Sequence, residues 1–283
     1  MMQWRSKMDL KTLYDTPPWE WPEGTDKLLL QILRDDRTDQ SECLLAAELA
    51  GDFTVVNDEL VAVLLLILSN DHAPENLRGQ AAISLGPALE SADIDGFEEL
   101  GAAPITEQAF RKIKETLRKL YADAGVPKNV RRRILEAAVR APQDWHQNAI
   151  RAAYLSDDDD WKLTAVFCMG YIQGFDDWIL ESLGNKNADI HYQAVCAAGN
   201  WEVDAAWPHI AGLVTSAETE KSLLLAAIEA SVSVRTQEAI EILGTLTDAD
   251  DKDIVEAVYE AMSMAGAFWE EGDDENEDDE FLH

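Results

Sequence analysis

A helical phrase rich in alanine and ending in glycine recurs along this chain of 283 residues. Two clear copies run from Arg78 to Gly86 and from His191 to Gly199. When the copies are aligned, one residue of each occupies the same column of the alignment. Successive residues of this column are 29 to 35 positions apart, except for one interval of 53. The column residues are Ala46, Ala81, Ile134, Ala165, Ala194, Ala226 and Val258. Self-similarity at this period is typical of solenoids, in which each unit buries its apolar face against its neighbours.

The repeat predicts the fold class. We expect an all-α protein, a right-handed α-solenoid of about six to seven antiparallel helix pairs, with the Ala-rich phrase as the first helix of each pair. Residues 56–68 read as a second helix that is apolar all round, as expected for a helix between two neighbours. The interval of 53 residues predicts an insertion at 87–104, as a loop or a short helix.

Composition divides the chain into three segments. Residues 1–25 contain Pro17-Pro18-Trp19-Glu20-Trp21-Pro22, and we expect an N-terminal arm that either caps the open end of the array or serves as a binding epitope. Residues 26–269 form the solenoid. Residues 270–283 are an acidic tail, which we expect to be disordered because it is too polar to pack.

The phrase resembles the HEAT-like repeat in the short form found in phycobilin lyases and many bacterial scaffold proteins. The resemblance lies in an acidic or Asn-containing turn, an apolar residue, a basic residue and an Ala-rich helix that ends in glycine, as in residues 189–199 and 160–170. It covers roughly residues 26–268 and implies a fold rather than a particular function. Ile134 and the pair Ser222-Leu223 depart from the pattern.

The charge limits the classes of partner. With 55 acidic and 23 basic side chains, the formal charge is −32, which disfavours nucleic acids and anionic membranes and favours basic proteins or peptides. The longest apolar run, residues 60–68, is far shorter than the ~20 residues that a bilayer requires. Cys43, Cys168 and Cys196 lie in Ala-rich phrases without metal spacing, so we expect core cysteines in a reducing compartment. The expected location is cytoplasmic.

One basic segment interrupts the acidic background. Residues 111–140 carry ten basic and three acidic side chains, a local charge of +7 against −39 for the remainder. An anion-binding stripe would consist of Arg111, Lys114, Arg118, Arg131, Arg132 and Arg133. Three interpretations stay open: a solvated face that balances neighbouring acidic helices, a site for an anionic partner, or a docking site for the protein's own tail.

The sequence offers no catalytic, cofactor or metal motif. Asp157–Asp160 is interpreted as a helix cap, and Asp93–Gly96 lacks the ligands of a calcium loop. His72, His146, His191 and His209 are scattered without ligand spacing, so no zinc site is expected. Trp161, Trp178, Trp201 and Trp207 are interpreted as side chains that join adjacent repeats. Catalytic groups could still converge from distant repeats, and the enzyme class stays open.

The leading hypothesis is a non-enzymatic scaffold that holds a basic protein or peptide on an acidic surface lined mainly by second helices. The candidate lining residues are Asp176, Asp177, Glu181, Glu202, Asp204, Glu238 and Glu241. The resemblance also leaves a lyase-type enzyme that cradles a tetrapyrrole, and a nucleic-acid-related protein. For the nucleic-acid-related protein, the candidate residues are Trp145 and Asp144, which stand beside the basic segment. A variant of this hypothesis is that the acidic surface itself mimics DNA.

Overall fold

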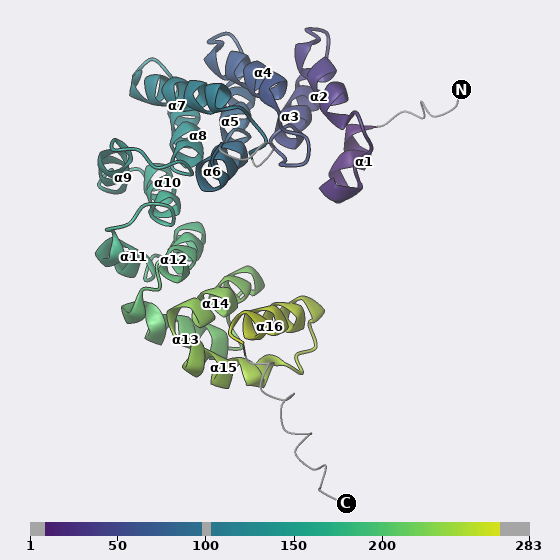
Figure 1. Ribbon diagram of the computed structural model, residues 1–283. Helices are drawn as coiled ribbons and strands as arrows, with labels where there is room; N and C mark the ends of the chain where they lie inside the picture. Colours follow the sequence, from purple (N-terminus) through teal and green to yellow (C-terminus); the bar gives the residue numbers. More distant parts are fainter. Residues whose placement is uncertain (1–8, 98–102, 267–283) are drawn as a thin grey trace, which may run out of the picture. The chain divides into compact units, whose positions relative to one another are not determined.

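The computed structural model describes residues 9–97 and 103–266, and within them only helices, turns and loops occur. The chain divides into two compact units, Met1–Ala149 and Ile150–His283 (Figure 1). Each is a run of packed helix pairs, so the predicted all-α solenoid fold is confirmed. The acidic tail predicted at 270–283 lies outside the described residues.

The first unit contains α1 (Leu10–Tyr14), η1 (Pro18–Glu20), α2 (Thr25–Arg34), α3 (Gln40–Leu49), α4 (Asp58–Ser69), α5 (Glu75–Ile83), α6 (Gly86–Asp95), α7 (Glu107–Ala122) and α8 (Lys128–Ala138). The boundary between the units falls within α9 (His146–Tyr154). The second unit contains α10 (Asp159–Met169), α11 (Asp176–Ser182), α12 (Ala188–Asn200), η2 (Asp204–Ala206), α13 (Trp207–Thr215), α14 (Lys221–Val234), α15 (Thr236–Leu243), η3 (Gly244–Leu246) and α16 (Lys252–Met264).

The Ala-rich helices are α3, α5, α8, α10, α12, α14 and α16, and all seven residues of the repeat column are buried in them. In the first unit α5 packs between α3 and α8, and in the second unit α12 and α14 pack between α10 and α16. Small side chains allow this because helix axes approach closely only where side chains are short. At the end of α12, a Cβ on Gly199 would meet Ala230 of α14 at 2.9 Å, which explains the glycine that closes the phrase.

The prediction that the Ala-rich helix opens each pair is wrong. The helices α3, α5, α8, α12 and α14 pack more extensively on the helix before them than on the helix after them. A loop of five residues joins the two helices of each of these pairs. The residue that ends the loop is Asp39, Pro74, Pro127, Asn187 or Glu220. The Asp, Asn and Glu side chains accept hydrogen bonds from the first turn, and Pro fits the start of a helix.

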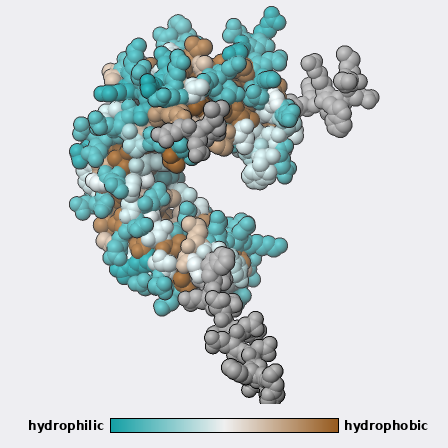
Figure 2. Space-filling model, in the orientation of Figure 1, coloured by the Kyte–Doolittle hydropathy of each residue, from teal (hydrophilic) through white to brown (hydrophobic). Residues whose placement is uncertain are grey.

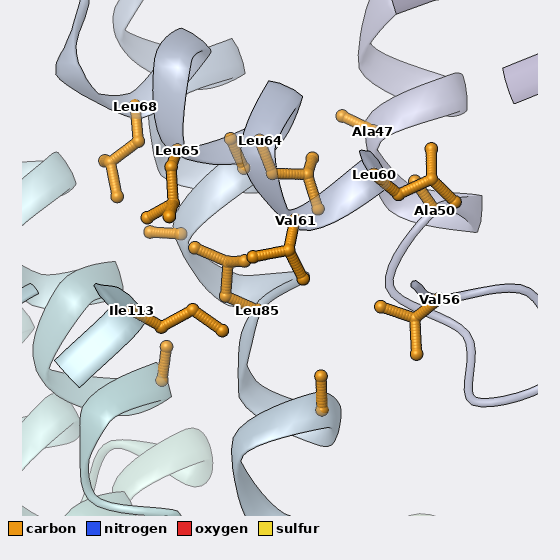
Figure 3. Close-up of a cluster of buried hydrophobic side chains, with 14 of the residues drawn as sticks. Ala47, Ala50, Val56, Leu60, Val61, Leu64, Leu65, Leu68, Leu85 and Ile113 are labelled. Atoms are coloured by element: carbon orange, nitrogen blue, oxygen red, sulfur yellow. The ribbon is translucent and has the colours of Figure 1, made fainter. Parts of the chain in front are cut away.

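The core of the first unit forms around α4, the helix predicted to be apolar all round. Asn57 caps it, and α4 packs against α2, α5 and α7. Figure 3 shows Leu60, Val61 and Leu64 of α4 turned toward side chains from its neighbours. Leu60 and Leu64 are fully buried, and each stabilises the fold by roughly 2 kcal/mol through the apolar area it removes from water.

The N-terminal arm packs on the end of the first unit through α1, which contacts α3. Leu10 and Leu13 are buried, and the indole N–H of Trp21 donates to the carbonyl oxygens of Leu13 and Thr16, both at 2.9 Å. Trp19, by contrast, is 78% exposed. Trp21 of the arm therefore packs against the core of the first unit, whereas Trp19 is left in solvent.

The insertion predicted at 87–104, as a loop or a short helix, contains most of a helix, α6. It begins within α6, whose buried Ala88, Leu89 and Ala92 pack toward α7 and α8. Residues 98–102 lie outside the described residues.

Candidate interaction grooves

The predicted acidic lining residues are all exposed. They lie on α11 and α15, each of which precedes an Ala-rich helix, and in the connection between α12 and α13. Asp176 and Asp177 begin α11, and Glu181 lies near its end. Glu202 and Asp204 lie between α12 and α13, whereas Glu238 and Glu241 lie on α15. The structure brings two of them together on one cation.

That cation is Arg235. Its Nε donates to Asp204 Oδ1 at 2.7 Å, and its Nη1 lies 3.5 Å from Glu238 Oε1. The hydrogen bond from Arg235 lowers the pKa of the Asp204 carboxyl. These two carboxylates are therefore partly neutralised within the protein, which reduces what they can offer to a basic partner.

The predicted basic stripe divides between two helices. Arg111, Lys114 and Arg118 lie on α7, where Arg111 pairs with Glu107 and the Lys114 Nζ lies 4.7 Å from the centroid of the Phe110 ring. On α8, the Arg131 Nε donates to the carbonyl oxygen of Tyr121 at 2.9 Å, which fixes the end of α7 to α8. Arg132 is half-buried on α8.

Arg133 of α8 faces a groove on the Ala-rich helices of the first unit and pairs with Glu136 at 2.7 Å. This arm groove, as we call it, has a volume of about 990 Å³ and is lined by α3, α5, α8, the N-terminal arm and the segments between them. Tyr14, Pro18 and Trp21 of the arm form one wall. Carboxylates, amides and apolar side chains of the helices form the rest.

The second unit has a more strongly acidic groove, which we call the carboxylate groove. It has a volume of about 480 Å³ and lies on the Ala-rich helices α14 and α16, with Tyr192 of α12 at its side. Its acidic residues are Glu229, Asp253, Glu256 and Glu260, and among the described residues no basic side chain lines it. Leu225, Val232 and Met264 are among its apolar residues.

Only one of these four carboxylates has an internal cation as partner within the described residues. Lys221 donates to Asp253 at 2.6 Å and to Asp251 at 2.8 Å. Glu256 and Glu260 are four residues apart on α16, where like charges destabilise a helix. The pKa of the Tyr192 phenol is raised mainly by its interaction with Cys196, and further by burial and by Glu229. The groove is thus a concentrated negative site above an apolar floor.

Glu229, Glu256 and Glu260 were not among the predicted lining residues, because the prediction placed the lining on the other helix of each pair. Their spacing from the repeat column could have identified them. Glu229 follows the column residue Ala226 by three positions, and Glu256 and Glu260 flank the column residue Val258. Side chains that flank a buried helix position lie at the edge of the buried face, where grooves form.

The structure confirms that the Asp157–Asp160 run caps a helix, and that Trp178 and Trp201 join neighbouring helices. Asp158 caps α10 by accepting from the backbone N–H groups of Asp160 and Trp161. The Trp201 indole donates to the carbonyl oxygen of Met169 at 2.6 Å, and Trp178 stacks on Tyr154 with ring centroids 4.6 Å apart. None of the three cysteines forms a disulfide, and Cys168 is fully buried.

Two histidines that looked scattered in the sequence lie together. The Nε2 atoms of His191 and His209 are 2.7 Å apart, which joins α12 to α13. Burial lowers the pKa of both imidazoles, and the pKa of His191 is lowered further by the neighbouring His209. Within the described residues, no three His, Cys, Asp or Glu side chains gather closely enough to hold a metal ion.

No protein-family model matches the chain, and no curated protein matches it either. Human deoxyhypusine hydroxylase in complex with glycerol is 15% identical, with a TM-score of 0.41 over 91% of this chain and 88% of that chain. The Escherichia coli protein YibA is 16% identical, with a TM-score of 0.45 over 87% of this chain and 84% of that chain. An engineered protein is 14% identical, with a TM-score of 0.34 over 87% of this chain and 98% of that chain.

These TM-scores all lie below 0.5, so the fold is assigned from the helices and their packing described above. The narrower resemblance to phycobilin lyases stays a prediction. In the part of the chain that the structure describes, no helix combines the length and the apolar character needed to cross a bilayer.

Proposed function

We propose that this protein is a non-enzymatic scaffold that binds a basic protein segment in the carboxylate groove of its second unit. The observation that supports this most strongly is the lining itself. Four carboxylates meet around an apolar floor, and no basic side chain of the described residues lines the groove. Of these four carboxylates, Lys221 pairs with Asp253 alone.

The chemistry of the groove suits lysine or arginine side chains. Their ammonium or guanidinium groups would pair with Glu229, Glu256 and Glu260, while their aliphatic stems would cover Met264 and the small residues of the floor. A bound cation would also relieve the repulsion between Glu256 and Glu260. The net charge of −32 would accelerate the approach of a basic partner.

The test uses the full-length chain and a fluorescein-labelled peptide in which lysine alternates with leucine. We expect the double variant Glu256→Gln, Glu260→Gln to weaken binding at least tenfold, because two charge pairs are lost. The matched control is Glu181→Gln, Glu241→Gln, which removes the same charge from α11 and α15. We expect the control to change the affinity less than threefold, as measured by fluorescence anisotropy.

Salt gives a second readout of the same proposal. Between 50 and 300 mM sodium chloride, we expect the affinity of the wild type for the peptide to fall steeply, because ion screening weakens charge attraction. Affinity that is independent of salt would contradict the proposal. A loss confined to the control variant would instead assign the basic partner to the carboxylates of α11 and α15.

A further inference from the structure

The arm groove of the first unit has a different chemistry from the carboxylate groove. It crosses three successive Ala-rich helices, α3, α5 and α8, and the N-terminal arm closes one side. Gly79 of α5 keeps it open, since a side chain at this position would project beside Arg133. The groove is therefore long enough to hold an extended segment across successive repeats.

The wall formed by the arm is aromatic and held in place. The Trp21 indole is oriented by its two hydrogen bonds to the carbonyl oxygens of Leu13 and Thr16. Tyr14 is 59% exposed at the edge of the groove, beside Pro18. Flat aromatic side chains with a fixed orientation bind apolar rings at little entropic cost.

Two asparagines in the groove occupy the same place in successive repeats. Asn76 and Asn129 are each the second residue of their helix, after Pro74 and Pro127 respectively. The Asn76 Oδ1 accepts from the Gln40 Nε2 at 2.9 Å, which leaves its amide N–H groups to donate. Asn129 is exposed and makes no side-chain hydrogen bond within the described residues. The groove thus presents amide donors at an interval of one repeat.

That interval matches the geometry of a polyproline-II helix. Packed helices such as α5 and α8 have axes about 8–10 Å apart. A polyproline-II segment repeats every three residues at about 3.1 Å per residue, so equivalent carbonyl oxygens recur about every 9 Å. Its backbone makes no internal hydrogen bonds, and its carbonyl oxygens are free to accept from the two asparagines.

The negative charge of the arm groove favours an occupant that carries a basic residue. Glu48, Asp52 and Glu75 line it, against Arg133 alone, and Arg133 is already paired with Glu136. An occupant with one or more cations would balance this excess.

We propose that the arm groove is a second binding site, which takes an extended polyproline-II segment of a partner protein that carries lysine or arginine. Prolines would pack on Tyr14, Pro18 and Trp21, backbone carbonyl oxygens would accept from Asn76 and Asn129, and cations would pair with the carboxylates. This site lies wholly within the first unit and does not depend on the carboxylate groove.

The test compares two fluorescein-labelled peptides of equal length and charge, four repeats of Lys-Pro-Pro and four repeats of Lys-Gly-Gly. We expect the full-length chain to bind the proline peptide at least tenfold more tightly, because it is already in the bound conformation. The double variant Asn76→Ala, Asn129→Ala should lose at least tenfold in affinity for that peptide. Gly79→Gln, which places a side chain in the groove, should lose as much.

One control keeps the result specific. Gln147→Ala with Asn148→Ala removes two exposed amides from α9 and should leave the affinity for the proline peptide unchanged. Circular dichroism and thermal unfolding check that each variant is folded. Equal affinity for the two peptides, no binding of the proline peptide, or an unchanged affinity in the Asn76 and Asn129 variant would each overturn the proposal.

Discussion

His146 is a fully buried imidazole at the start of α9, and its environment favours the neutral form. Its Nδ1 accepts from the backbone N–H of Gln143 at 3.1 Å, so the neutral ring carries its proton on Nε2. Burial, and secondarily the charge of Lys114, lowers its pKa from 6.5 to about 4. The group therefore links the stability of the first unit to pH.

The sign follows from proton binding. Between pH 6.5 and 4 the unfolded chain protonates this histidine and the folded chain does not, so stability falls as the pH falls through that window. The contribution amounts to roughly 3 kcal/mol across the window. We expect the difference in unfolding free energy between wild type and His146→Leu to shrink by this amount from pH 7 to pH 4, measured by denaturant titration. A difference that is constant with pH would contradict the prediction.

At the scale of the element, close packing between neighbouring Ala-rich helices depends on particular glycines. Gly→Ala normally stabilises a helix by up to about 1 kcal/mol. In Gly199→Ala the new Cβ would meet Ala230 at 2.9 Å, and we expect a net loss of about 1–3 kcal/mol, because α12 and α14 must separate. The matched control is Gly212→Ala in α13, where the new Cβ has no neighbour within 4 Å. Thermal unfolding should move the two variants in opposite directions, and a stabilised Gly199→Ala would contradict this account.

The Ala-rich helices show which features of the fold could be predicted from the sequence. The column from Ala46 to Val258 was predicted correctly, because small residues at helical spacing reveal which face of a helix is buried. They do not reveal which neighbour covers that face, so the pairing was predicted wrongly. The constant five-residue loop before α3, α5, α8, α12 and α14 carried that information. The carboxylates and amides of the two grooves come from successive Ala-rich helices, so finding them required knowing which helices pack side by side.

Contacts between residues distant in sequence were beyond such reasoning. His191 and His209 are 18 positions apart and meet because α12 and α13 both present their first turns to one another. No local spacing encodes such a meeting. The arm groove likewise joins Tyr14 to Arg133 through packing alone.

At the scale of the whole molecule, the charge of −32 opposes folding, because compaction brings like charges together. Screening should relieve this repulsion. We therefore expect the melting temperature to rise between 10 and 200 mM sodium chloride, measured by calorimetry. A fall would mean that ion pairs such as Lys221 with Asp251 outweigh the repulsion. Choline chloride at equal ionic strength is the control, because simple screening requires the same rise with both salts.

The scaffold proposal predicts the opposite salt response for binding in the same buffers. Salt that stabilises the folded chain should weaken its hold on the lysine peptide, because both effects arise from one excess of carboxylates. A general loss of structure would lower the melting temperature and the affinity together, whereas screening would separate them. Measuring both quantities on one sample series therefore distinguishes weakened attraction from partial unfolding. A rise of both quantities with salt would show that the negative charge does not attract the partner.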